Sequence, residues 1–139
     1  MNRNITLSIT LALSVLWGAD AALACSCAPL PEPQQAKDQA AAVFTGTVLG
    51  ITQEDNRRLV RLRMEESWKG AKCGEVTVTT GLGDADCGYA FQEGQTYLIY
   101  ADKDRGKLTT NICSRTRPAA EAGDDLTALG TPAADCSEK

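Results

Sequence analysis

The sequence has no histidine among its 139 residues. Histidine is the commonest general base and metal ligand in proteins, so its absence excludes Ser–His and Cys–His nucleophile pairs and imidazole metal sites. Carboxylates remain as acid–base groups, but a pair such as Asp84 and Asp86 lies in a glycine-rich turn, where acidic side chains are usually solvated. We therefore expect that the protein is not an enzyme.

Aromatic residues and clustered positive charge are also scarce. The chain has two Phe, two Trp and three Tyr, and its formal net charge is -4. Nucleic-acid binding relies on clustered Lys and Arg and on aromatic stacking platforms, so we expect no nucleic-acid partner. The one concentrated basic stretch, from Arg57 to Arg63, alternates with apolar residues, which is typical of a strand with one solvated face.

The first part of the chain has the features of an export signal. Ile5–Trp17 is apolar apart from Ser and Thr, follows an N-terminal Arg, and is too short to span a bilayer comfortably. Ala22 and Ala24 are the small residues that signal peptidases require before the cut. We expect removal of residues 1–24, a secreted or periplasmic location, no membrane association afterwards, and Cys25 as the new first residue.

Two other ways of processing remain open. The motif Ala19-Asp20-Ala21 also has small residues at the required spacing, and its use would leave three residues ahead of Cys25. A lipoprotein signal would make Cys25 the first residue but would acylate its amine. Such signals favour Leu three residues before the cysteine, where this chain has Ala22.

Six cysteines follow the signal, and an even number in an exported chain usually forms disulfides. The paired C-x-x-C knuckles of a four-cysteine zinc site are absent. Cysteines two positions apart bridge each other only with strain, so Cys25 and Cys27 are each expected to bond a distant partner. The mature N-terminus would then be stapled to the domain at two points.

The remaining pattern predicts a short helix over 34–40 and then strands. Period-2 alternation and β-branched residues predict five strands, over 41–52, 60–68, 76–80, 96–101 and 107–113. A second helix is expected over 118–129, and the aromatic residues expected in the core or at its rim are Phe44, Trp68, Tyr97 and Tyr100. Five short strands in sequence favour an all-β fold with flanking helices, a disulfide-stapled, five-stranded OB-fold barrel.

A doubly stapled terminus has two interpretations. Chain ends normally fray, so the staples are either general reinforcement of a small domain or the means of holding a functional end still. An α-amine has a pKa of about 7.7–8 and, with the carbonyl oxygen of the same residue, forms a five-membered chelate ring. Such a pair can occupy the open position of a catalytic zinc in another protein and displace its water.

Several motifs of the mature chain match a known family. They are the opening Cys25-x-Cys27, the run Pro33-Gln34-Gln35-Ala36, the pair Cys87-Gly88, and Leu108-Thr109-Thr110 with Cys113-Ser114. In these motifs the chain resembles the N-terminal inhibitory domain of the tissue inhibitors of metalloproteinases, also called a netrin-like domain. The resemblance covers residues 25 to about 115 and implies one OB-fold domain, expected over residues 25–139.

The resemblance also implies a role for particular residues. It pairs Cys25 with Cys87 and Cys27 with Cys113, and it implies a secreted inhibitor whose Cys25 amine and carbonyl chelate the zinc of a target metalloprotease. The side chain of Ser26 would enter the pocket beside the zinc. The other expected contacts are the ridge Cys27, Ala28 and Pro29 and the flanking loop with Ala85 and Asp86. No cofactor of its own is implied, and we expect a monomer.

The chain departs from the family pattern in three respects. The family's third cysteine, expected near Lys37 or Asp38, is absent, whereas Cys73 is additional, and parity suggests a bond between Cys73 and Cys136. Asp86 places a carboxylate where a small apolar residue is usual. We also expect no second, C-terminal inhibitor domain. The alternative function is therefore an exported netrin-like protein-interaction module without inhibitory activity.

Overall fold

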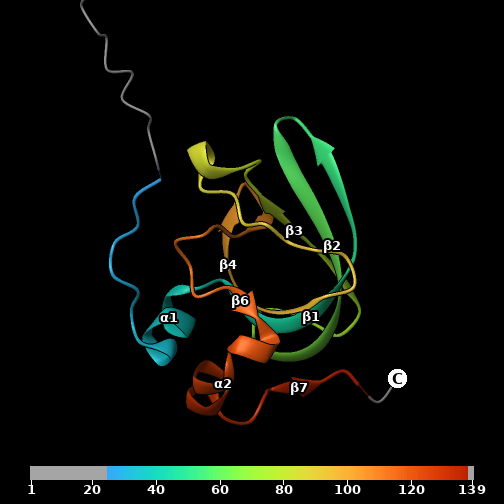
Figure 1. The fold of residues 1–139 in the computed structure, drawn as a ribbon. Helices are drawn as coiled ribbons and strands as arrows, with labels where there is room; N and C mark the ends of the chain where they lie inside the picture. The colour runs from blue at the N-terminus through green and yellow to red at the C-terminus, as the bar shows by residue number, and fades with distance from the viewer. Residues whose placement is uncertain (1–24, 138–139) are drawn as a thin grey trace, which may run out of the picture.

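The computed structural model describes residues 25–137, so the predicted signal in residues 1–24 lies outside the described residues. The described part is mostly β-sheet, with two short α-helices and three disulfides (Figure 1). The strands are β1 (Ala42–Glu54), β2 (Arg57–Lys69), β3 (Glu75–Thr80), β4 (Thr96–Asp104), β5 (Lys107–Thr109), β6 (Arg117–Pro118) and β7 (Ala134–Asp135). The helices are α1 (Pro33–Gln39) and α2 (Gly123–Leu129), with 3-10 turns η1 (Asp84–Asp86) and η2 (Ala119–Glu121).

Five of these strands pair in a closed ring. β1 is antiparallel to both β2 and β4, β2 is antiparallel to β3, and β4 is antiparallel to β5. A parallel pairing between β3 and β5 completes the ring. The short strands β6 and β7 lie outside it, where they pair with β4 and β2.

β1 closes the ring because it bends. Its pairing with β2 shifts register between Thr45 and Gly46 and again between Val48 and Gly50, as the interrupting glycines predict. At Gly46 a Cβ atom would lie 3.2 Å from the Arg63 carbonyl oxygen, so the absence of a side chain lets β2 approach closely. The bend lets one 13-residue strand face β2 along its length and β4 at its start.

Two hydrophobic clusters stabilise the fold. The first lies among the ring strands and includes Phe44, Leu62 and Ile99, all fully buried. The second joins both helices to the ring through Ala36, Val43, Trp68, Leu98, Tyr100 and Leu129. Residues 97–101 are all buried and alternate between the two clusters, which confirms that this strand is covered on both faces.

Trp68 corrects the expected inner row of β2. The alternation predicts that it shares a face with Val60, Leu62 and Met64, but it belongs to the second cluster, where its indole N–H donates to the Gly130 carbonyl (2.8 Å). The alternation ends at Met64, beyond which the burial pattern loses its period of two. The four aromatic residues expected in the core are all buried.

The predicted elements that differ most in extent from the structure are the last strand and the second helix. The strand expected over 107–113 ends at Thr109, because the following residues turn and the side chain of Asn111 accepts the Cys113 N–H (2.8 Å). The helix expected over 118–129 is divided, because Pro118 pairs with Tyr97 in β6 and only residues 123–129 form an α-helix. Pro118 and Gly123 favour such an interruption of the helix.

The third disulfide joins Cys73 to Cys136, the pairing that parity suggests, with Cα atoms 5.3 Å apart. It fixes the C-terminal tail beside β2, where the Cys136 N–H donates to the Glu65 carbonyl (2.7 Å). In Figure 1 this tail lies well away from the segment that begins at Cys25.

Replacing both cysteines of this bond with serine is expected to lower the free energy of unfolding by about 2–4 kcal/mol, because the bond closes a long loop in the unfolded chain. Any activity of the N-terminal segment should remain, since the bond is remote from it. Urea unfolding of the double variant measures the first effect, and a parallel binding or inhibition assay measures the second. A loss of activity without a loss of stability would contradict this expectation.

Candidate functional site

The N-terminal end of the described chain is an exposed, extended segment. Residues 25–30, here called the terminal segment, have no helical or strand structure, and Ser26–Leu30 are all exposed. Disulfides join Cys25 to Cys87 and Cys27 to Cys113, with Cα–Cα distances of 5.3 and 5.1 Å. This is the pairing that the family resemblance implies. The segment is therefore both accessible and held at two points.

The two loops that receive these disulfides are themselves joined. The Ile112 N–H donates to the Cys87 carbonyl (3.0 Å), and the Sγ atoms of Cys25 and Cys113 lie 3.8 Å apart. The sulfurs of Cys25, Cys87 and Cys113 form a compact group. Each is already bonded to another sulfur, so none provides the thiolate that a zinc ligand requires. The donors that Cys25 can offer a metal are its backbone groups.

The disulfide to Cys87 places the flanking loop, residues 81–88, next to Cys25 (Figure 1). Within this loop the Asp86 carboxylate accepts hydrogen bonds from the N–H groups of Leu82 (2.7 Å) and Gly83 (2.9 Å). These bonds lower the pKa of Asp86, so the carboxylate is charged at neutral pH. A Cβ atom on Gly81 would collide with this carboxylate. The Asp86 carboxylate, which stands where the family that the sequence resembles usually has a small apolar residue, thus has a structural role within the loop. Ala85 beside it is exposed.

A buried ion pair holds the other end of the terminal segment. The Arg115 guanidinium donates two hydrogen bonds of 2.7 Å to the Asp125 carboxylate, which is fully buried in α2. A third donation from the same guanidinium reaches the Pro31 carbonyl (2.9 Å). Tyr100 completes the group by donating its hydroxyl to Asp125 (3.1 Å). Arg115 therefore connects the backbone just after the terminal segment to the helical side of the fold.

The charges of this group are stabilised by one another. Burial alone would raise the pKa of Asp125, but hydrogen bonds from Arg115 and Tyr100 and the positive charges of Arg115 and Arg117 outweigh it, so the pKa is lowered. The hydrogen bonds that Arg115 donates to Asp125 in turn raise the pKa of Arg115. Burial and the neighbouring carboxylate raise the pKa of Tyr100, which keeps its hydroxyl protonated as a donor.

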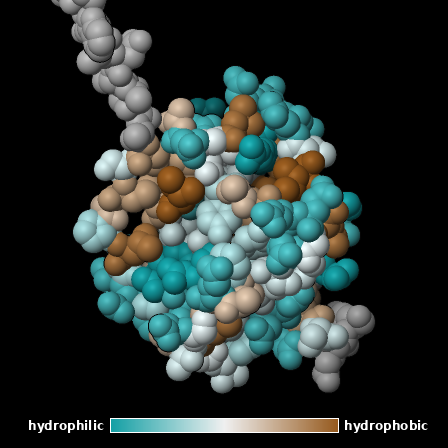
Figure 2. Space-filling model, in the orientation of Figure 1, coloured by the Kyte–Doolittle hydropathy of each residue, from teal (hydrophilic) through white to brown (hydrophobic). Residues whose placement is uncertain are grey.

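Two exposed hydrophobic side chains lie at the terminal segment, Leu30 as its last residue and Ile112 next to Cys113, which is bonded to Cys27. Among the described residues, Leu30 and Ile112 are the large hydrophobic residues that are exposed, at 40% and 43%. Figure 2 shows hydrophobic residues gathered on this face near the start of the described chain. A contiguous exposed apolar patch, unlike a single exposed residue, is typical of a protein-binding surface. Neither residue was predicted to be part of a site, because a single apolar residue in a loop carries no periodic signal.

The structure brings together most of the residues expected at the site. The terminal segment, including Ser26, Ala28 and Pro29, and the flanking loop meet at the Cys25–Cys87 bond. The contacts that these residues would make with a protease stay predictions. No family model and no curated protein matches the chain. Within residues 25–137, no helix has both the length and the apolar character needed to cross a membrane.

Proposed function

We propose that this protein is a secreted, monomeric inhibitor of zinc metalloendopeptidases, similar to the tissue inhibitors of metalloproteinases and built on a netrin-like OB-fold barrel. The closed ring of five strands with a parallel β3–β5 pairing supports the barrel. The three disulfides support export to an oxidising compartment. The proposal includes no enzymatic activity and no cofactor of its own.

The double attachment of an exposed terminal segment carries the functional part of the proposal. With the signal removed, Cys25 begins with a free amine adjacent to its own carbonyl oxygen, and its sulfur is occupied by the bond to Cys87. The amine and carbonyl would chelate the catalytic zinc of the target and displace the water that the protease needs. Because two disulfides already hold the segment, little conformational entropy is lost when it binds.

The other contacts follow from the order of residues along the segment. Ser26 would point into the pocket beside the zinc, and Cys27, Ala28 and Pro29 would lie along the substrate cleft. Ala85 and Asp86 would contact the rim of the cleft from the flanking loop. Leu30 and Ile112 extend the apolar part of this surface, because they are exposed beside it.

The test is a titration of the purified mature protein against a panel of zinc endopeptidases, after intact-mass measurement has established its first residue. We expect inhibition of at least one member with one-to-one stoichiometry. Acetylation near neutral pH, which favours the α-amine over lysine because of its lower pKa, should abolish it. Inhibition that survives complete acetylation would contradict the chelation mechanism.

The flanking loop gives specific support to the alternative, an exported netrin-like interaction module without inhibitory activity. Asp84 and Asp86 are both exposed beside Cys25, and their negative charge would be repelled by carboxylates in a protease cleft. The same titration separates the two functions. A module of this kind would leave every member of the panel fully active, whatever the state of its amine.

A further inference from the structure

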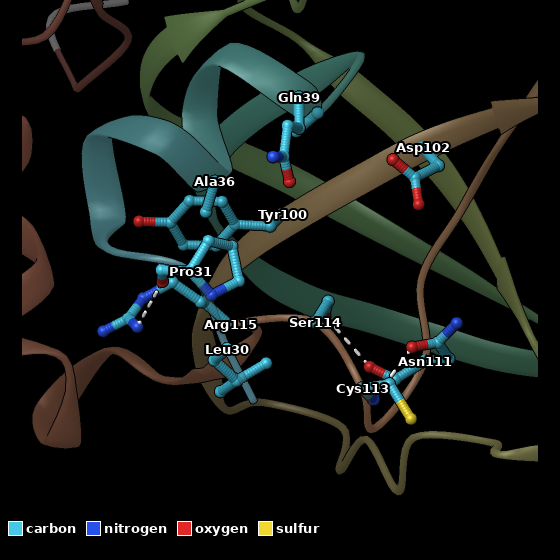
Figure 3. Close-up of a pocket in the computed structure, with 11 residues that line it drawn as sticks. Leu30, Pro31, Ala36, Gln39, Tyr100, Asp102, Asn111, Cys113, Ser114 and Arg115 are labelled. Atoms are coloured by element: carbon cyan, nitrogen blue, oxygen red, sulfur yellow. Dashed lines mark hydrogen bonds between the residues drawn. The ribbon is translucent and has the colours of Figure 1, made fainter. Parts of the chain in front are cut away.

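A small pocket opens directly behind the terminal segment. Its volume is about 200 Å³, and it lies between Leu30 and Pro31, helix α1, strand β4 and the loop that carries Cys113 (Figure 3). Pockets for small-molecule ligands usually have volumes of about 300–1,000 Å³. The size of this pocket is therefore suited to one long side chain of a protein partner.

The two sides of the pocket differ in chemistry. Leu30, Pro31 and Ala36 form an apolar side together with the ring of Tyr100, as Figure 3 shows. Asp102, Asn111 and Ser114 lie across from them. An occupant with an aliphatic stem and a polar end would satisfy both sides at once. Lysine and arginine side chains have this construction.

The charge of the lining favours a cation. The positive charge of Arg115 is offset by its bidentate bond to the buried Asp125. The Asp102 carboxylate is exposed and has no ion pair or hydrogen bond with any other described residue. Among the residues that line the pocket, Asp102 is therefore the charged residue without a partner, and it lies at the polar side.

We propose that this pocket binds a lysine or arginine side chain of the protein that docks on the terminal segment. The aliphatic stem packs against Leu30 and Pro31, and the cationic end pairs with Asp102. The identity of the partner rests on the proposed function, whereas the preference of the pocket for a basic side chain does not involve zinc or the Cys25 amine. This contact would favour partners that carry a lysine or arginine on the part of their surface that faces the pocket in the complex.

The probe is the blocked tripeptide acetyl-Ala-Arg-Ala-amide, compared with the same peptide carrying neutral citrulline, which has nearly the same shape. Backbone amide shifts of the mature protein are followed by NMR up to about 10 mM peptide, a range suited to millimolar dissociation constants. We expect the arginine peptide to shift amides of Gln39, Asp102 and Asn111 and to bind about two- to fivefold more tightly than the citrulline peptide.

Asp102→Asn should remove this preference, and Asp104→Asn is the matched control. Asp104 is an exposed carboxylate on the same strand that does not line the pocket, so its removal changes the net charge equally and should leave the preference intact. Equal binding of the two peptides to the wild-type protein, shifts confined to another surface, no shift at all, or equal effects of the two variants would each overturn the proposal.

The same peptide titration, carried out on the acetylated protein, separates this proposal from the proposed function. Acetylation blocks chelation but leaves the pocket unchanged, so the arginine preference should persist. A protein that inhibits no protease but still discriminates between the peptides would retain the pocket and lose the inhibitory mechanism. An inhibitor that binds the two peptides equally would retain the inhibitory mechanism and overturn the proposal for the pocket.

Discussion

A mature chain that begins one residue earlier, at Ala24, is expected to lose at least about a hundredfold in inhibitory affinity, equivalent to about 2.7 kcal/mol. The added residue converts the Cys25 amine into an amide, which is a poor metal ligand and carries the bulk of an alanine into the zinc site. The two disulfides and the packing of the domain do not involve this amine. The measurement is the inhibition constant of the extended and unextended proteins against the same zinc endopeptidase.

The control for this extension is the stability of the two proteins. Their urea unfolding midpoints should agree, because no contact within the described residues depends on the first nitrogen. Equal stability with unequal inhibition assigns the loss to the zinc ligand and not to the fold. An extended protein that inhibits as well as the one starting at Cys25 would refute amine chelation directly, and it would leave the binding-module function in place.

Replacing Asp125 with alanine is expected to lower the free energy of unfolding by about 3–5 kcal/mol. Asp125 is fully buried and accepts hydrogen bonds from Arg115 and Tyr100, so its removal leaves a largely buried guanidinium without its partner. Urea unfolding at neutral pH measures the loss. The matched control is Asp124→Ala, which removes the exposed neighbouring carboxylate of the same helix and should change stability little.

The same substitution is expected to weaken inhibition as well. Arg115 donates to the Pro31 carbonyl while Asp125 fixes its position, so without Asp125 the backbone behind the terminal segment is less restrained. Asp125→Asn keeps the shape of the side chain and should show a smaller loss of both properties. If Asp125→Ala were as stable and as inhibitory as the wild type, the ion pair would have no role in holding the segment.

The stability contributed by Asp125 should depend on pH in a defined direction. Its pKa in the folded protein is lowered below its ordinary value, so its contribution is fully present above the unfolded-state pKa of about 3.9. The contribution is lost as the pH falls through the lower, folded-state value. The difference in unfolding free energy between the wild type and Asp125→Asn should therefore shrink below about pH 4. A difference that stays constant from neutral to acidic pH would contradict this.

The strands were predictable because their signal is local. Alternating and β-branched residues identified the five ring strands, and the glycines of β1 identified where it bends. Trp68 was assigned to the wrong cluster because alternation extends only as far as a strand keeps its regular burial pattern. The strand β7 was not predicted, since a two-residue strand depends on the distant bond between Cys136 and Cys73 for its position.

The candidate site likewise has a part that could be predicted from the sequence and a part that could not. Its covalent part was anticipated: cysteine spacing predicted distant partners for Cys25 and Cys27, the family resemblance implied which ones, and the structure forms those two bonds. Its non-covalent part was not, because Arg115 and Asp125 are ten residues apart on different elements and neither position stands out in the sequence. The hydrogen bonds from the Leu82 and Gly83 N–H groups to the exposed Asp86 carboxylate were not predicted either, because loop hydrogen bonds carry no periodic signal.

The sequence by itself determined that histidine chemistry is absent, and it predicted where a mature chain begins and that two cysteines near that point bond distant partners. Only the tertiary structure decided that those partners lie in adjoining loops, that a buried ion pair restrains the backbone behind the terminal segment, and that a pocket opens beside it. The reason is physical. Composition and spacing act through the chain itself, whereas the terminal segment, the flanking loop and α2 become neighbours only when the ring of strands closes.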